Sequence, residues 1–211
     1  GALVSFVIVL MLADHRGVIS SLRLVLSGLA VSYCFSGLTS FITITAPDRD
    51  LARAILSWML GSLAGADWPN LGLPAAVLVL GLVLVMVNAR SLNAMVLGGE
   101  TAATLGVDAM RLRRQLLVVM SLVTGIMVAV SGAIGFVGLM VPHMGRLMVG
   151  ANHRRLLIMS ALVGSIFLIW VDVIARAAFA PVELPIGIIT ALLGGPFFLW
   201  LMRRRLHDRE S

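Results

Sequence analysis

The stretch 115-QLLVVMSLVTGIMVAVSGAIGFVGLMVP-142 holds 28 consecutive residues without an Asp, Glu, Lys or Arg. As one straight α-helix it would be about 42 Å long, which exceeds the ~30 Å hydrocarbon core of a bilayer. Its second half contains four residues that can interrupt a helix: Gly132, Gly135, Gly138 and Pro142. We therefore predict one membrane span that ends near Ser131, then a break and a second, glycine-rich element that reaches about Val149.

The rest of the chain has the same apolar character. It is 60% hydrophobic with a mean hydropathy of +1.05, and only 12% of its residues are charged. An ordinary soluble domain carries about 25% charged residues. Further uncharged runs at 24–47, 71–89 and 184–202 have the length, roughly 20 residues, that spans a bilayer. The sequence therefore predicts an all-α fold, a polytopic transmembrane helical bundle with six to seven membrane elements.

We place the other membrane elements at 1–13, 22–45, 71–89, 156–178 and 186–202. The first would be only about 20 Å long as a helix, so we expect the chain to begin inside a span, with further helices upstream. The polar turn 14-DHRG-17 follows it. Residues 1–211 are predicted to form one transmembrane domain.

The arginines predict how this domain lies in the membrane. All sixteen basic residues are arginine, and they gather at the ends of the hydrophobic runs, so the net charge of +6 does not indicate a nucleic-acid partner. Alternating spans put thirteen of them on one side, with the segments 14–23, 90–114 and 146–155 and the C-terminus. The positive-inside rule places that side in the cytoplasm.

Residues 46–70 then face outward. This stretch is predicted to be a periplasmic loop that holds a short amphipathic helix. Asp48 is suited to cap that helix, because an aspartate at this position accepts hydrogen bonds from the first free backbone N–H groups. Trp58 and Trp68 suit an interfacial position.

The span 22–45 carries small and polar residues along one helical face. Gly28, Ser32, Ser36, Thr39 and Thr43 are spaced by four, four, three and four residues. Such a stripe indicates either close helix packing with interhelical hydrogen bonds or the lining of a translocation pathway. Periodicity alone leaves both alternatives open.

Two other patterns favour packing or pairing. In the last span Gly187, Ala191 and Gly195 form a small-residue ladder, for which we predict helix packing. Asp172 and Arg176 stand four residues apart near the outer end of their span, at the spacing of a helix-surface ion pair. An ionisable residue within a membrane is also a candidate functional site, so a carrier role for Asp172 stays open.

A short polar segment, 97-LGGETAATLGVDAMRLRRQ-115, interrupts the apolar sequence on the cytoplasmic side. Glycines at both ends can end or redirect a helix, and Glu100 would lie in the first turn, where a carboxylate favours the helix dipole. The segment is either an ordinary connection or a docking element that inserts into a cytoplasmic partner, where small residues permit close approach.

Motifs for catalysis are scarce. The sequence has no Walker A motif, no GxSxG and no HExxH, and its four histidines are scattered. The single cysteine, Cys34, lies in an apolar run. We therefore expect no enzyme activity, no bound metal and no cofactor in this chain, and we expect its energy to come from a partner.

Taken together, these segments resemble those of a known family, the FecCD-type permease subunits of bacterial ABC importers for iron–siderophores, haem and vitamin B12. The similar stretches run in family order along nearly the whole chain: 24-LVLSGLAVS-32, 56-LSWMLGSLAG-65, 98-GGETAATLGV-107, 132-GAIGFVGLMVPHMGRLMVG-150, 152-NHRRLL-157, 171-VDVIAR-176 and 183-ELPIGIITALLGGPFFLWLM-202. The order is more specific than any single stretch.

The resemblance implies the last six to seven membrane helices of a ten-helix permease in the bacterial inner membrane, with the first helices absent. It implies a second permease subunit, as homodimer or pseudo-dimer, two cytoplasmic ATPase subunits that use ATP and Mg²⁺, and a periplasmic or lipid-anchored substrate-binding protein. Within 90–114 it implies ATPase-coupling residues: Gly98, Gly99, Glu100, Thr101, Ala102, Leu105 and Gly106. The stripe residues Ser32, Ser36, Thr39 and Thr43 would line the pathway, and Arg176 would dock the binding protein.

The function implied is ATP-driven import of a metal chelate, with ferric siderophore expected ahead of haem and cobalamin on family frequency. The rival hypothesis is an ion-coupled secondary transporter that uses Asp172 as its carrier site. A neighbouring ATPase gene would favour the first hypothesis. Uptake that survives ATP depletion would favour the second.

Overall fold

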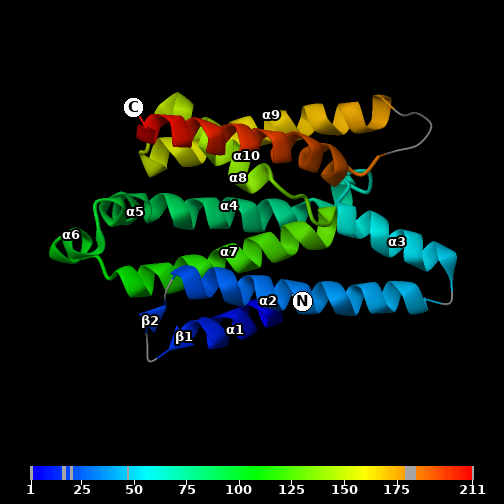
Figure 1. Cartoon of the computed structure of the whole chain (residues 1–211), viewed down its shortest axis with the longest axis horizontal. Coiled ribbons are helices and arrows are strands. Elements are labelled where there is room, and N and C mark those ends of the chain that lie inside the picture. Colours follow the sequence, from blue (N-terminus) through cyan, green and yellow to red (C-terminus); the bar gives the residue numbers. More distant parts are fainter. Residues whose placement is uncertain (1, 16–17, 20, 47, 179–183, 211) are drawn as a thin grey trace.

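The computed structural model describes residues 2–15, 18–19, 21–46, 48–178 and 184–210, and it is helical apart from one very short β-ribbon (Figure 1). The elements are α1 (Ala2–Ala13), β1 (Asp14–His15), β2 (Val18–Ile19), α2 (Ser21–Thr45), α3 (Arg49–Leu60), the 3₁₀ turn η1 (Trp68–Asn70), α4 (Gly72–Val87), α5 (Ala89–Val96), α6 (Gly99–Thr104), α7 (Ala109–Ser131), α8 (Val137–Val149), α9 (His153–Ala177) and α10 (Ile186–Glu210). The predicted all-α fold is confirmed.

Within the described residues, four helices are long and apolar enough to cross a membrane: Leu22–Thr45, Ala109–Ser131, His153–Ala177 and Ile186–Arg203. A fifth crossing is possible if α4 and α5, which meet at a bend of 54°, act as one span. The helix α8 is apolar but shorter. The helices lie where the six to seven membrane elements were predicted, but among the described residues only four of them, or five with the bent pair, have the length and composition of a span.

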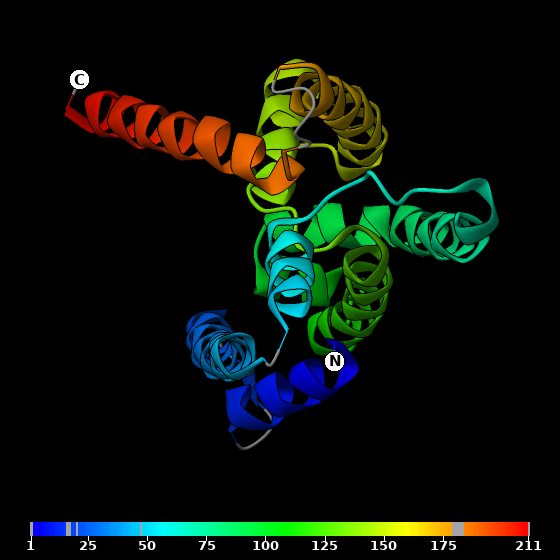
Figure 2. The same ribbon diagram turned by 90° about the vertical axis from the view of Figure 1, so that its right-hand side faces the viewer.

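Most of the long helices run along the long axis of the molecule, whereas α10 is inclined to it (Figures 1 and 2). Helices α1 and α2 pack together, α7 lies between α1 and α4, and α8, α9 and α10 form a further group. Viewed from the end, α10 extends away from the others (Figure 2). The β-ribbon, α6, the α8–α9 turn and the end of α10 lie at one end, and α3 lies at the other (Figure 1).

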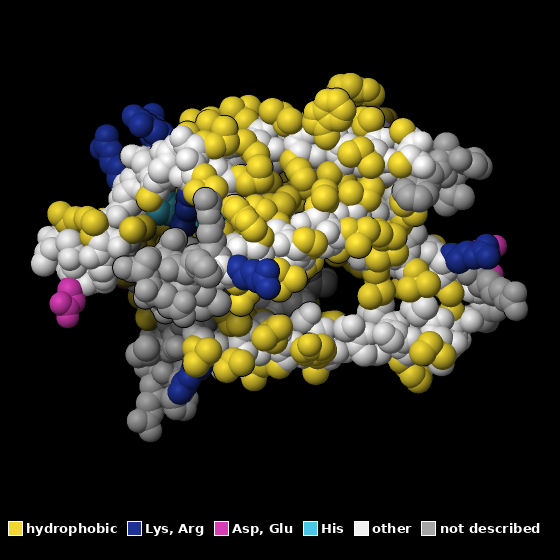
Figure 3. All heavy atoms as spheres, turned by 45° about the horizontal axis from the view of Figure 1, so that its top comes forward, with side chains coloured by type: hydrophobic (Ala, Val, Ile, Leu, Met, Phe, Trp, Pro, Cys, Tyr) yellow, Lys and Arg dark blue, Asp and Glu magenta, His cyan; other side chains and the backbone are white. Residues whose placement is uncertain are grey.

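The two ends carry the charged side chains. Figure 3 shows arginine side chains towards both ends of the visible face and hydrophobic side chains over most of the surface between them. The described parts of the four segments in which the sequence gathers thirteen arginines share the end that holds α6 (Figure 1). This end is called the arginine-rich end below.

The break predicted within 115–142 is present. Helix α7 ends at Ser131, and Gly132 follows with a φ of 69°, a left-handed conformation that favours glycine. Helix α8 begins at Val137, after Phe136, whose φ of 65° is the one positive value among the described residues other than glycine. Pro142 lies inside α8 and does not end it. The reversal therefore depends on the glycine-rich stretch before the proline.

The short helix predicted within 46–70 is present as α3. Asp48 caps α3, because its side chain accepts a hydrogen bond of 3.0 Å from the backbone N–H of Asp50. The predicted interfacial residues Trp58 and Trp68 are 50% and 89% exposed. This loop leads to a small core in which Val171, Ala175 and Ile186 are buried. The core joins α9 to the start of α10.

The ladder prediction for α10 is only partly correct. Gly187 does pack closely, against the main chain of Leu60, but Ala191 is exposed and a Cβ at Gly195 would meet nothing within 4 Å. The close contact is made instead by the preceding residue, Gly194, which lies against the ring of Phe136. The reason is that Phe136, in its left-handed conformation, reaches a different side of α10 from the one that the four-residue spacing selected.

Candidate functional site

The segment after α4 begins with a bend that the sequence did not predict. We expected the span to end at residue 89 and a connection to follow, but a second helix, α5, leaves α4 at 54°. Asn88 occupies the bend, and its side-chain amide donates a hydrogen bond of 2.8 Å to the carbonyl of Leu84. The same carbonyl also accepts from the backbone N–H of Asn88 at 3.3 Å, so Asn88 caps the end of α4 with both its main chain and its side chain.

Helix α6 has a glycine at each end. Gly98 has a φ of 114° and precedes the helix, and Gly106 has a φ of 76° and follows it. The N–H of Gly106 donates to the carbonyl of Ala103, and that of Val107 donates to the carbonyl of Ala102, both at 2.9 Å. This pair of bonds is a Schellman motif, in which a left-handed glycine satisfies the last carbonyls of a helix.

The predicted coupling residues differ in exposure. Gly98, Gly99, Glu100, Thr101, Leu105 and Gly106 are all exposed. Ala102 is fully buried in the chain. It therefore packs α6 against its own neighbours and cannot belong to an exposed contact surface. Two residues that the sequence analysis did not select, Val96 and Leu97, are exposed beside α6 at 64% and 69%.

Two asparagines and an aspartate hold this segment in place. The Oδ1 atom of Asn93 on α5 accepts a bond of 2.9 Å from the backbone N–H of His153 and lies 2.8 Å from Nδ1 of the same residue. Asn152 caps α9 by accepting from the N–H of Arg154, and Asp108 caps α7 by accepting from that of Arg111, both at 3.0 Å. Helix α5 is thereby joined to the start of α9, a link that no local sequence signal could predict.

The predicted pathway stripe lies on α2. Ser32 and Ser36 are exposed, and Thr39 and Thr43 are half-buried. The two threonine hydroxyls donate to the carbonyls of Phe35 and Thr39, each at 2.8 Å, so both are satisfied inside their own helix. None of the four lines the cavity of about 300 Å³ that α2 shares with α1. The stripe therefore faces away from this cavity, with its two serines exposed and its two threonines partly covered.

A larger cavity, of about 670 Å³, lies between α1, α3 and α7. Its lining is mostly apolar but includes Trp58 of α3 and the polar residues Ser121 and Thr124 of α7. The sequence analysis did not select these two, although their spacing of three residues places them on one face of the helix.

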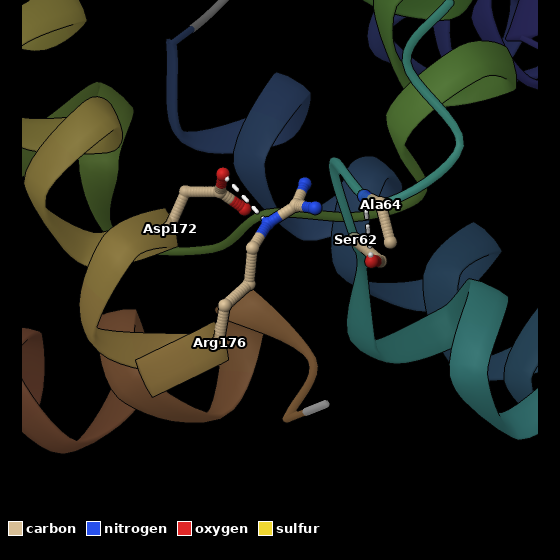
Figure 4. Close-up of polar contacts among 4 residues, drawn as sticks. All are labelled: Ser62, Ala64, Asp172 and Arg176. Atoms are coloured by element: carbon tan, nitrogen blue, oxygen red, sulfur yellow. Dashed lines mark hydrogen bonds and ion pairs between the residues drawn. The ribbon is translucent and has the colours of Figure 1, made fainter. Parts of the chain in front are cut away.

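Asp172 and Arg176 form an ion pair on α9, with 3.0 Å between Nε of the arginine and Oδ2 of the aspartate (Figure 4). The Arg176 side chain is 44% exposed and that of Asp172 is 24% exposed. The predicted helix-surface pair is confirmed. The bond uses Nε, and the two terminal nitrogens of the guanidinium point away from the aspartate (Figure 4).

The structure does not bring the three predicted groups together. The coupling residues lie at the arginine-rich end, the stripe runs along α2, and Arg176 lies near the opposite end of α9 (Figure 1). Among the described residues, no group of three or more His, Cys, Asp or Glu is placed to hold a metal ion. The arrangement is that of separate contact surfaces along a membrane bundle.

A bundle of membrane-length helices with one short exposed helix beyond it is the architecture of a multi-pass membrane protein. More particularly, the chain belongs to the FecCD transport family, whose family model matches residues 1–204. The resemblance found in the sequence is thereby confirmed.

The relatives come from bacteria and archaea. The chain is 44% identical over 205 residues to the cobalamin import system permease protein BtuC of Halobacterium salinarum, a match that covers 97% of this chain and 54% of that protein. It is 40% identical to the hemin transport system permease protein HmuU of Yersinia pestis, covering 90% and 56%. It is 38% identical to the Fe(3+) dicitrate transport system permease protein FecD of Escherichia coli, covering 97% and 63%. The chain thus spans little more than half the length of these relatives.

A solved structure is also similar to this chain. It is described as an inward-facing conformation of a metal-chelate type ABC transporter, and its chain is 34% identical to this one with a TM-score of 0.81. The match covers 88% of this chain and 60% of that one.

Proposed function

We propose that the protein is the permease subunit of a binding-protein-dependent ABC importer, and that it moves a metal chelate across the cytoplasmic membrane. The observation that carries the proposal is α6, an exposed six-residue helix between two left-handed glycines at the arginine-rich end of a FecCD-family bundle. Two ATPase subunits would bind there and use ATP and Mg²⁺, and a second permease subunit would complete the membrane part. This chain itself would catalyse no covalent step.

The geometry of α6 suits a coupling contact. Its ends are fixed by glycine conformations and hydrogen bonds, and the buried Ala102 packs it against its neighbours in the chain. A movement of the ATPase subunits would therefore displace α6 as a folded helix and move the helices joined to it. Glu100 and Thr101 offer polar contacts, and Leu105 offers an apolar one. For ATP to drive transport, the nucleotide-bound ATPases must bind one position of this segment better than another.

The other two surfaces fit the remaining roles. The stripe from Ser32 to Thr43 presents small polar groups that suit a hydrophilic chelate passing between two permease subunits. Arg176 keeps its terminal nitrogens for an acidic group of a substrate-binding protein, since a guanidinium carries five N–H donors and the Asp172 pair uses the one on Nε. Ferric siderophore is the cargo that we propose first, and haem and cobalamin complexes are the alternatives.

The test is uptake by proteoliposomes that contain the complete permease, its ATPase and its binding protein. We expect labelled ferric siderophore to enter only with ATP, and haem and cobalamin to be taken up more slowly. Faster uptake of either alternative would correct the cargo and leave the mechanism intact. Uptake without ATP that a protonophore abolishes would instead favour the secondary transporter.

A further inference from the structure

A cavity of about 540 Å³ lies where the α4–α5 bend meets the start of α9. Its volume falls within the roughly 300–1,000 Å³ that ligand pockets usually have. The residues that matter in its lining are Arg90, Asn93, Asn152 and Arg154, with Met86 and Val87 from the last turn of α4. None of the predicted coupling, pathway or docking residues lines it.

The polar part of this cavity consists of donors. Among the described residues, neither Arg90 nor Arg154 has a carboxylate within ion-pair distance. The Oδ1 atoms of Asn93 and Asn152 already accept bonds from backbone N–H groups at the start of α9, which leaves their amide N–H groups as the remaining polar groups. Two guanidinium groups and two amides beside a helix N-terminus suit an anion.

The apolar part shows which anion fits. Met86 and Val87 end a helix of membrane character, so the cavity opens at the level where hydrocarbon meets headgroups. Val87 is 75% exposed, which leaves apolar surface beside the arginines. An acidic protein side chain would use the charge but not this apolar surface, whereas a phospholipid would use both.

We propose that this cavity binds the phosphate of an anionic phospholipid from the leaflet at the arginine-rich end. Basic pockets between membrane helices on the cytoplasmic side hold such headgroups. The lipid would brace the α4–α5 bend against α9, next to the Asn93–His153 link. This inference does not rest on the proposed transport function, because a chain that moved no chelate would still bind the lipid.

The experiment is native mass spectrometry of the delipidated protein, titrated with phosphatidylglycerol and with phosphatidylcholine of the same acyl chains. We expect phosphatidylglycerol to be retained preferentially, and Arg90→Gln and Arg154→Gln each to weaken it about fivefold. The double substitution to lysine should keep most of the preference, because it keeps the charge. Arg114→Gln, an exposed arginine of α7 at the same end, is the matched control and should bind like the original.

Four outcomes would overturn the proposal. The first is equal retention of both lipids, and the second is an equal loss in Arg114→Gln, which would mean diffuse attraction to the whole arginine-rich end. The third is saturation by inorganic phosphate or glycerol phosphate at the same concentration as the lipid, which would identify a soluble anion as the ligand. The fourth is normal lipid retention by the double glutamine variant with loss of ATPase binding, which would assign the arginines to a protein carboxylate. Circular dichroism and the melting temperature of each variant check folding.

Discussion

The main-chain oxygen of Leu60, the last residue of α3, occupies the place where a Cβ of Gly187 would stand, so α3 and α10 meet through bare backbone. The carbonyl of Trp58 lies in the same way against Gly132, at the break between α7 and α8. The N–H of Ser62 also donates to the carbonyl of Ser131 at 2.8 Å. Helix α3 is thereby fixed to two parts of the bundle that are far apart in sequence.

Gly187→Ala should destabilise the protein by about 1–3 kcal/mol, because the added methyl must displace main-chain atoms that cannot rotate away. Gly195→Ala on the same helix is the control. A Cβ there meets nothing, so this change should be neutral or stabilise by up to about 1 kcal/mol through helix propensity. Unfolding in detergent, followed by circular dichroism, measures both. Equal stability of the two variants would contradict the close contact between Gly187 and the main chain of Leu60.

Gly106→Val should disrupt the end of α6, since a left-handed conformation costs an L-residue roughly 1–2 kcal/mol and a β-branched residue adopts it poorly. Gly106→Asn should be tolerated better, because asparagine visits this region more readily. The readout is hydrogen exchange of the Val107 amide, which donates to the carbonyl of Ala102. Gly99→Ala, in open space without a positive φ, should leave that exchange unchanged.

Glu100→Arg should abolish ATP-driven uptake and weaken ATPase binding while the protein stays folded, because the side chain is exposed and its proposed contact is with the partner. Ala102→Leu should act differently. It would overpack a fully buried site and lower the stability of the chain itself by about 1–3 kcal/mol. Uptake at the original rate with Glu100→Arg would contradict the coupling role of α6.

Asn93→Ala should cost about 1–2 kcal/mol of stability, because it removes the acceptor that α5 supplies to the start of α9. Asn93→Asp keeps the acceptor and should retain most of that stability. Comparing the two variants separates the contribution of the hydrogen bond to stability from that of having a side chain of this size at position 93. If alanine and aspartate lowered the melting temperature equally, the link between α5 and α9 would not be the cause.

Asp172→Asn should change stability by at most about 1 kcal/mol, because the ion pair with Arg176 is partly exposed. ATP-driven uptake should persist. The secondary transporter predicts the opposite, loss of uptake, because it would need an ionisable group at this position. Transport assays of Asp172→Asn with and without a protonophore therefore decide between an ATP-driven importer and an ion-coupled secondary transporter.

Much of the fold could be predicted from local pattern. Helix α7 was expected to end near Ser131 and α8 near Val149, and both end there, since uncharged length and glycines determine where a membrane helix starts and stops. Asp48 was expected to cap α3 and does, because a cap needs only the few residues that follow it. These signals lie within one or two turns of the chain.

The errors have a common cause. Helix α5 was missed because Asn88 bends the chain without a glycine or proline, and because the residue that ties α5 to α9, Asn93, bonds to His153, sixty residues further along the chain. The spacing of Gly187, Ala191 and Gly195 named a packing face, but the ring of Phe136 selects Gly194. The complete burial of Ala102, one of the predicted coupling residues, was not foreseen, because burial in a short helix depends on its neighbours. Each error concerns packing between helices, which the pattern of a single segment does not specify.

The sequence by itself determined that this is a membrane bundle of the FecCD family, which segments cross, and which end carries the arginines. Hydrophobic length, charge and glycine position are properties of contiguous residues, and the bilayer acts on each segment separately. Only the tertiary structure decided which glycines admit another backbone, how α5 is tied to α9, and that two arginines and two asparagines line one cavity. Such contacts join segments far apart along the chain, and the packing of the whole bundle determines them.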